Sequence, residues 1–189
     1  ASCCDTYSAN HPNVHVICSD IRNVTPEQIL PHISKDGVDL VTSGMPCETF
    51  STAGNTSRSF YDDRQFLFRE GIRIAQITNA KMILFENVPA ITTKTVAQNS
   101  KKLIVDVIKQ ELTDAGYGNY IEVVLSATQF GVPQKRKRYF KRSWSKYYFQ
   151  NYFLIHALLF ALLVLVLHRI LFQQLYLNHI LFQIFLHFL

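Results

Sequence analysis

The chain has 189 residues, a formal net charge of +5 and a pI of about 9.0. Its length suffices for one domain with a hydrophobic core, and its mild basic excess weakly favours a polyanionic partner. Its four cysteines form no Cys-x-x-Cys pair, which argues against a zinc finger or a thioredoxin-like motif, and no metal site is predicted.

Short apolar runs alternate with helical patterns along residues 1–140. The apolar runs predict strands at residues 14–18, 38–42, 82–85, 120–125 and 136–140. Helices are predicted after the N-cap Thr25, within residues 60–80 and at residues 103–112. This alternation predicts an α/β domain around a largely parallel sheet.

Three reactive side chains follow the ends of predicted strands: Asp20, Cys47 and Glu86. In open α/β sheets, ligands bind beyond the carboxyl ends of the strands. We therefore expect these three side chains to converge on one rim of the sheet.

The loop of residues 44–51 places Cys47 behind a proline and among small or polar residues. Most free cysteines are small buried hydrophobes, and that is the alternative here. The polar surroundings favour instead a nucleophilic thiol directed into a cleft, whose thiolate would need nearby cations.

Two later segments offer an acid and cations. Glu86 directly follows four apolar residues. In one interpretation its carboxylate turns to solvent or caps the next turn. In the other, apolar surroundings keep the carboxyl group protonated, so that it can donate to a ring nitrogen. Gln134, Arg136 and Arg138 would share one face of a strand. That face is either a solvated basic patch or a surface that fixes a base edge and neutralises phosphates.

These motifs, in this order, resemble those of the cytosine-5 DNA methyltransferases. The resemblance covers about residues 1–140, with Met45 and Glu48 standing where many members have proline and glutamine. The matching segments are Pro46-Cys47 with Phe50-Ser51, Glu86-Asn87-Val88, Gln134 to Arg138, Asp62 to Leu67, and Asp20-Ile21.

The resemblance implies transfer of a methyl group from S-adenosylmethionine to C5 of a cytosine flipped out of double-stranded DNA, in a restriction-modification system, on a partial Rossmann-like sheet. It assigns Cys47 to attack at C6, Glu86 to donation at N3, and Arg136 and Arg138 to holding the base and the catalytic loop. It further assigns Asp20, Ile21 and Pro46 to cofactor binding, and Asn87, Val88, Gln134 and Ser51 to the base or its loops.

Parts of the family pattern are absent from the chain. There is no Phe-x-Gly-x-Gly cofactor loop, no acidic residue for the ribose, and no target recognition region after residue 140. Because the chain opens at Ala1 in polar sequence, we expect that its beginning is missing. Because no secretory signal precedes the cysteines, we expect reduced thiols and a cytoplasmic location. The predicted unit is a partial catalytic domain over residues 1–140 with weak or no activity.

Residues 141–189 are predicted to form a hydrophobic helical tail, and no Asp or Glu occurs after Glu122. A frameshift near residue 140 of an AT-rich coding sequence is the favoured explanation. A membrane segment is an alternative, although the apolar run of residues 152–167 is shorter than the roughly 20 residues that a span needs. An amphipathic partner helix is the third.

The expected partner is double-stranded DNA, bound by a monomer, with a restriction endonuclease as a genetic partner only and without membrane association. Two other functions stay open: a non-catalytic DNA-binding remnant that uses the basic run of residues 135–142, and a membrane-associated protein that uses residues 152–189. A thiol hydrolase is disfavoured, because it would need a histidine near Cys47.

Overall fold

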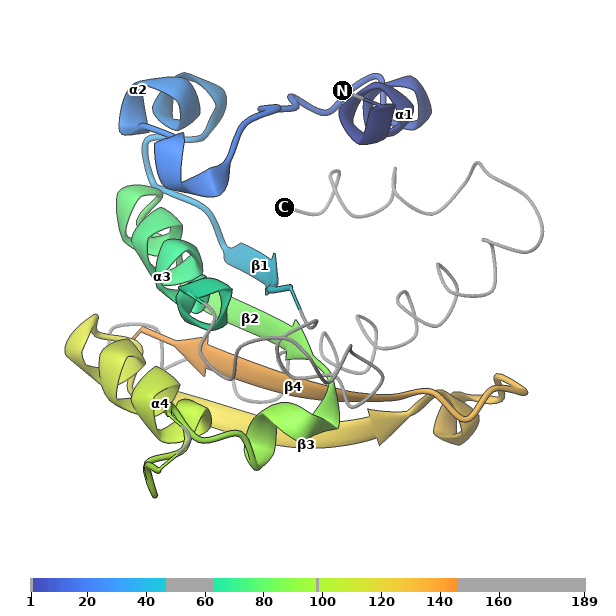
Figure 1. Cartoon of the computed structure of the whole chain (residues 1–189). Helices are drawn as coiled ribbons and strands as arrows, with labels where there is room; N and C mark the ends of the chain where they lie inside the picture. The colour runs from blue at the N-terminus through green and yellow to red at the C-terminus, as the bar shows by residue number, and fades with distance from the viewer. Residues whose placement is uncertain (1, 47–62, 98, 146–189) are drawn as a thin grey trace.

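The computed structural model describes residues 2–46, 63–97 and 99–145, and within them it shows an α/β fold (Figure 1). The strands are β1 (Leu40–Gly44), β2 (Met82–Asn87), β3 (Asn119–Ser126) and β4 (Lys137–Trp144). The α-helices are α1 (Ser2–Asn10), α2 (Pro26–Ile29), α3 (Phe68–Ile77) and α4 (Ile104–Asp114). Short 3-10 helices are η1 (Ile21–Asn23), η2 (Leu30–His32), η3 (Asp63–Phe66), η4 (Pro89–Thr92) and η5 (Ala127–Phe130). The hydrophobic tail beyond residue 145 lies outside the described residues.

The four strands form one sheet in the order β1-β2-β4-β3. β1 and β2 are parallel, whereas β4 is antiparallel to both of its neighbours, β2 and β3. Three of the four described strands, β1, β2 and β3, therefore run in the same direction, and β4 is the antiparallel exception to the predicted largely parallel sheet. The short connection through η5 is the reason, because it can join β3 to β4 only as antiparallel neighbours.

The strand predicted at residues 14–18 does not form. This segment runs without a ladder partner between α1 and η1, while β1 occupies an edge of the described sheet. A short apolar run becomes a strand only when a neighbouring strand accepts its backbone hydrogen bonds. The strand predicted at residues 136–140 does form, and it continues to Trp144.

The hydrophobic core lies between one face of the sheet and the helices α3 and α4. Ile83 and Phe85 of β2 and Tyr139 of β4 are nearly inaccessible and belong to one cluster with side chains of both helices. The α3 residue Gly71 permits this close packing, since a Cβ at that position would lie 2.9 Å from the Phe85 ring and 3.0 Å from the Ser43 hydroxyl oxygen. The predicted helix of residues 103–112 is confirmed as α4, and its buried face includes Ile108 and Leu112.

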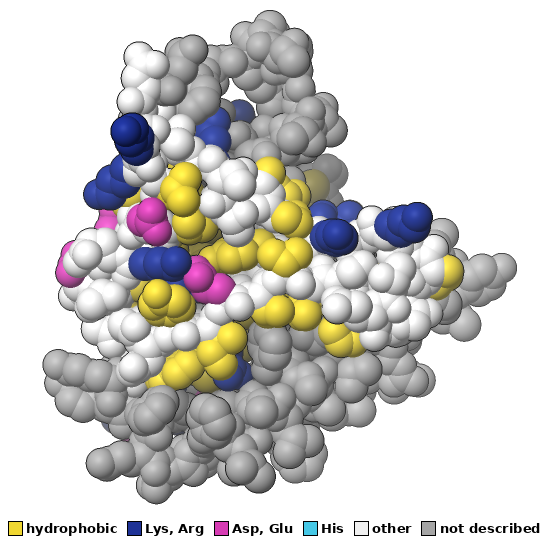
Figure 2. Space-filling model, turned by 90° about the horizontal axis from the view of Figure 1, so that it is seen from below, with side chains coloured by type: hydrophobic (Ala, Val, Ile, Leu, Met, Phe, Trp, Pro, Cys, Tyr) yellow, Lys and Arg dark blue, Asp and Glu magenta, His cyan; other side chains and the backbone are white. Residues whose placement is uncertain are grey.

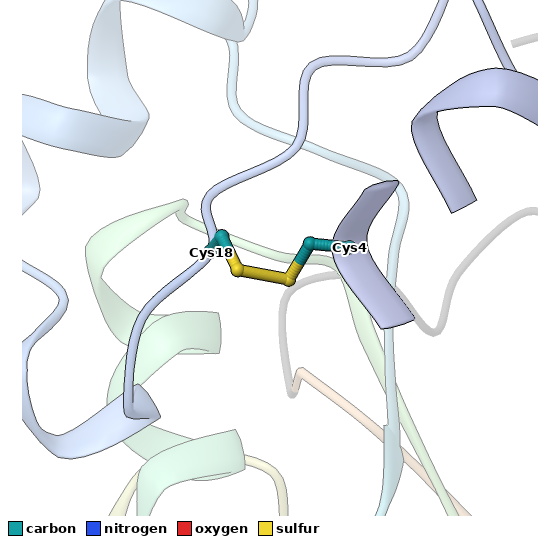
Figure 3. Close-up of a disulfide and its surroundings, with 2 residues drawn as sticks. All are labelled: Cys4 and Cys18. Carbon is teal, nitrogen blue, oxygen red and sulfur yellow. A yellow bond between two sulfur atoms is a disulfide. The ribbon is translucent and has the colours of Figure 1, made fainter. Parts of the chain in front are cut away.

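The N-terminal helix α1 stands apart from the sheet, and an extended segment leads from it to η1 and α2 (Figure 1). A disulfide between Cys4 of α1 and Cys18 ties the two ends of this segment together, with a Cα–Cα distance of 6.0 Å (Figure 3). The prediction of reduced thiols is wrong for this pair, because the chain doubles back and brings distant cysteines together; Cys3 is free and exposed. No helix in the described ranges is long and apolar enough to cross a bilayer.

Candidate active site

The carboxyl ends of β1 and β2 lie side by side. Gly44 is in register with Glu86, so the chain leaves β1 directly beside this carboxylate. Asn87 is 1% exposed; its Nδ2 donates to the Met45 carbonyl oxygen at 3.5 Å, and its Oδ1 accepts a hydrogen bond from the Val88 amide at 2.8 Å. A buried amide therefore links the end of β2 to the first residue after β1. Pro46, the next predicted site residue, is exposed, and Cys47 and Ser51 lie outside the described residues.

Glu86 forms an ion pair with Arg138 across the sheet. The Arg138 Nε lies 2.6 Å from the Glu86 Oε1, and the two side chains are 22% and 38% exposed, respectively. Glu86 is in register with Phe140, so Arg138, two residues away, projects from the same face of the sheet. Sequence reasoning expected apolar surroundings for this carboxyl group. The structure instead gives it a guanidinium partner and leaves it partly exposed to solvent.

The other residues of the predicted basic face precede β4. Gln134 and Arg136 lie in the turn before the strand, which begins at Lys137, and the Arg136 carbonyl accepts a hydrogen bond from the Ala127 amide at 2.8 Å. The prediction that Gln134, Arg136 and Arg138 share one strand face is therefore wrong. Gln134 is exposed, whereas the Arg136 Nε is buried and has no hydrogen-bond partner among the described residues.

Basic side chains gather where β3 passes into β4. Viewed from below, Lys and Arg side chains stand at this end of the molecule without acidic side chains beside them, whereas the opposite end shows both charges (Figure 2). Lys135 and Lys137 in this turn are exposed. This surface suits an anionic partner near the Glu86–Arg138 pair.

Asp20 and Ile21 lie at the start of η1 and follow no strand, which corrects the expectation that Asp20 marks a strand end. The Asp20 carboxylate accepts hydrogen bonds from the amide, Nε and Nη2 of Arg22, and these bonds lower the Asp20 pKa to about 2. The Ile21 side chain is 40% exposed. An anionic acceptor and an exposed apolar side chain are groups that can bind the amino edge and the face of an adenine ring.

A buried charged cluster, missed by sequence reasoning, lies on the helix-covered face of the sheet. The Lys141 side chain is 0% exposed, and its Nζ lies 3.1 Å from the Glu122 Oε1 and 3.3 Å from the centroid of the Tyr120 ring. The Tyr139 hydroxyl donates to the same Glu122 oxygen at 2.6 Å, and the Lys109 Nζ lies 3.2 Å from the other. Lys141 is thus no part of an exposed basic run over residues 135–142.

Burial lowers the pKa of Lys141 to about 8, although Glu122 acts in the opposite direction. Burial and the adjacent Glu122 both raise the pKa of Tyr139. For Glu122, burial alone would raise the pKa, but the hydrogen bonds from Tyr139 and Lys141 outweigh it and lower the pKa. The sequence carries no local signal for this cluster, because Lys141 stands in a basic run and its burial beside Tyr139 and Ser143 is seen only in the structure.

Metal-ligating side chains do not cluster in the described part of the chain: no group of three or more His, Cys, Asp or Glu residues there could hold an ion.

Comparison with known proteins places these residues in a family context. The C-5 cytosine-specific DNA methylase family matches residues 1–159. Type II methyltransferase M1.HphI of Haemophilus parahaemolyticus is 39% identical over 136 residues, which are 71% of this chain and 35% of that protein. Type II methyltransferase M.DdeI of Desulfomicrobium norvegicum is 36% identical over 135 residues, which are 71% of this chain and 31% of that protein. The chain thus spans about a third of the length of these relatives.

Solved structures share the fold. A putative DNA modification methyltransferase encoded in an Escherichia coli prophage superposes with a TM-score of 0.56 at 23% identity, covering 79% of this chain and 39% of that one. A DNMT2 mutant of Spodoptera frugiperda gives a TM-score of 0.54 at 24% identity, and the match covers 79% of this chain and 41% of that one. The sheet with its two covering helices therefore has the arrangement found in methyltransferases.

Proposed function

Because the chain belongs to the C-5 cytosine-specific DNA methylase family, we propose that its residues perform the cytosine-activating part of DNA cytosine-5 methylation. The substrate is a cytosine flipped from double-stranded DNA, and S-adenosylmethionine supplies the methyl group when bound. We extend the proposal to a monomeric, cytoplasmic enzyme of a restriction-modification system.

The observation that supports this function best is the Glu86–Arg138 ion pair at the rim of the sheet where β1 ends. Arg138 lies 2.6 Å from Glu86, and Glu86 is in register with Gly44, three positions before Cys47. Attack on a pyrimidine ring requires a nucleophile, an acid and a cation, and we assign these roles to Cys47, Glu86 and Arg138.

The reaction uses these groups in sequence. The Cys47 thiolate forms a bond to C6 of the cytosine while Glu86 donates a proton to N3, which moves electron density to C5. With the methyl group supplied to C5, a solvent water would take the C5 proton; the electron pair of that C–H bond forms the C5–C6 double bond, the C6–sulfur bond breaks to release the Cys47 thiolate, and the N3 proton returns to Glu86. Arg138 orients Glu86 and the base, Asn87 holds the end of the catalytic loop through Met45, and Pro46 lies between that contact and Cys47.

The cofactor would be held by the chain's own adenine-facing groups, Asp20 and Ile21, which η1 presents on an exposed surface. Gln134, Arg136, Val88 and Ser51 are proposed to line the base or its loops. Because the chain spans about a third of the length of its relatives, we expect little methylation by these residues alone.

Transfer of a labelled methyl group from S-adenosylmethionine to duplex DNA tests the proposal. To supply the absent parts, residues 1–140 replace the matching segment of M1.HphI, and the chimera is assayed beside the chain itself. We expect methylated cytosine with the chimera and none after Cys47→Ser, whereas Cys3→Ser, which changes an exposed free cysteine, retains activity. A folded chimera without activity, or an active Cys47→Ser variant, contradicts the proposal.

Glu86→Gln separates catalysis from stability in the same chimera. We expect the methylation rate to fall at least about 100-fold, because general acid catalysis typically contributes that much. The free energy of unfolding should change by less than about 1 kcal/mol, since the Glu86–Arg138 pair is partly exposed. Glu111→Gln, which changes a carboxylate paired with Arg69 on the helices, is the matched control and should leave the rate unchanged.

A further inference from the structure

Arg73 of α3 connects the helix to the segment that carries Asp20 and Ile21. Its Nη2 donates to the Ile21 carbonyl oxygen at 2.7 Å, and its Nη1 donates to the Val24 carbonyl oxygen at 2.9 Å. Its Nε donates to Glu70, one turn earlier on the same helix, at 2.7 Å. Each of the three guanidinium nitrogens therefore donates to a protein oxygen, and two of these oxygens belong to η1 and its C-cap.

The two carbonyl groups bracket the 3-10 helix η1. Ile21 is its first residue, and Val24 is its C-cap, whose amide donates back to the Ile21 carbonyl at 3.2 Å. A planar guanidinium presents its donors in a rigid fork that fixes the separation of two carbonyls, whereas an ammonium group is a compact point charge on a flexible stem. Glu70 fixes the rotation of this guanidinium, because it occupies the third nitrogen.

Among the described residues, few other contacts join the surrounding segment to the helices of the sheet. Residues 11–20 form no regular secondary structure, and Val24 is the one buried hydrophobic residue described between residues 3 and 39. The Asp20 and Arg22 side chains pair with each other, and the Arg22 guanidinium also interacts electrostatically with Glu70 of α3. The contacts of Arg73 with two backbone oxygens are thus a principal link between η1 and α3, a helix packed on the sheet.

We propose that Arg73 is a positioning residue for cofactor binding, which holds η1 against α3 so that Asp20 and Ile21 are presented in one fixed arrangement. The inference rests on the proposed function, in which Asp20 and Ile21 contact the adenine of the cofactor. Arg73 itself does not touch the cofactor, since its donors are directed to protein oxygens.

Amide hydrogen exchange on the full chain without ligand tests the first part of the proposal, that Arg73 holds η1 against α3. In Arg73→Met, exchange at the Asn23 and Val24 amides, which close η1, should accelerate about tenfold or more, because charge-assisted hydrogen bonds are lost. Exchange in β2 and α4 should not change. Arg69→Met is the matched control, because it removes another arginine of α3, one that pairs with Glu111 instead of η1. Unchanged exchange at Asn23 and Val24 would overturn the proposal.

Titration with S-adenosylhomocysteine, followed by NMR on the same full-length proteins, tests the second half. We expect Arg73→Met to weaken binding about tenfold and Arg69→Met to have no effect, with partial recovery in Arg73→Lys, which restores one donor group. A merely structural role would change exchange but leave the affinity intact, and that result would overturn the proposal.

The two readouts separate this inference from the proposed function. If the wild-type chain shows no S-adenosylhomocysteine binding at millimolar concentration, the cofactor role of η1 fails with the proposed function, whatever the exchange data show. If the wild type binds and Arg73→Met binds equally well, the proposed function stands and the role of Arg73 is refuted.

Discussion

The helix-covered sheet and the N-terminal segment of residues 2–36 are stabilised in different ways. In the sheet, apolar side chains of β2, β4, α3 and α4 are almost completely removed from water. In the N-terminal segment, Tyr7, Ile21 and Leu30 are 40%, 40% and 48% exposed. Its described links are instead specific: the Cys4–Cys18 disulfide and the hydrogen bonds from Arg73.

This difference divides the proposed site into two parts. Glu86 and Arg138 lie on strands of the packed sheet, so their geometry follows from burial of many side chains. Asp20 and Ile21 lie on η1, so their placement depends on a few polar contacts. Regions held by few apolar contacts open locally at low free energy, whereas core strands open only with global unfolding.

The largest expected effect concerns the core. Phe68→Ala removes a 0% exposed side chain from the cluster between α3 and the sheet. We expect a loss of about 3–5 kcal/mol in the free energy of unfolding, because the substitution loses apolar burial and leaves a cavity. Urea unfolding measures it. Leu30→Ala in the N-terminal segment should cost no more than about 0.5 kcal/mol, and similar losses for both variants would remove the contrast between the regions.

The next effect concerns the disulfide. Reduction, or Cys4→Ser, should destabilise the α1 segment by about 3 kcal/mol, the chain-entropy estimate for a closed loop of this size. The residues that it joins are 14 positions apart. Hydrogen exchange should show lost protection in α1 without any change in β2, and Cys3→Ser should leave both unchanged. Simultaneous loss of protection in β2 would mean that the two regions unfold as one unit.

The smallest effect is a pH dependence that originates in the core. The Lys141 pKa is lowered by burial to about 8, below the 10.5 of a solvated lysine, so the unfolded chain binds more protons between these values. The free energy of unfolding should therefore rise between pH 8 and 10, by up to roughly 2 kcal/mol. Above pH 10 it should fall, because Tyr139, whose pKa is raised, keeps its proton only when folded.

Urea unfolding from pH 7.5 to 10 measures this dependence. Lys141→Met should abolish the rise. Lys109→Met should retain the rise in the free energy of unfolding. Burial lowers the pKa of Lys109, but Glu122 raises it by more, so the stabilisation from the charged Lys109 is lost only at higher pH. A rise that persists in Lys141→Met would assign the titration to another group.

Much of the fold could be predicted because several elements carry strong local patterns. Residues 82–85 are a continuous apolar run and form β2. Residues 103–112 have an amphipathic pattern and form α4. Each pattern indicates which side chains the segment must bury and therefore which element it forms. The resemblance to cytosine-5 DNA methyltransferases is confirmed by the family match. The roles of Cys47, Glu86, Arg136 and Arg138 stay predictions.

The predictions that failed depend on partners distant in the sequence. Residues 14–18 have a strand-like sequence, but no neighbouring strand pairs with them. Arg136 has the alternating spacing of a strand residue, but its carbonyl accepts a hydrogen bond from the Ala127 amide in the turn, and β4 begins only at Lys137. Lys141 looks like one cation of a basic run, and only the packing of α4 against β3 and β4 encloses it.

By itself, the sequence determined the chemistry available to this protein: the order of its motifs, the residue types at the strand ends, and the α/β alternation. Only the tertiary structure decided that β4 lies between β2 and β3, that Arg138 faces Glu86, that Cys4 meets Cys18 and that Arg73 holds η1. The reason is physical, because local patterns report backbone preference and burial, whereas ion pairs, disulfides and strand neighbours depend on distances that arise when the whole chain packs.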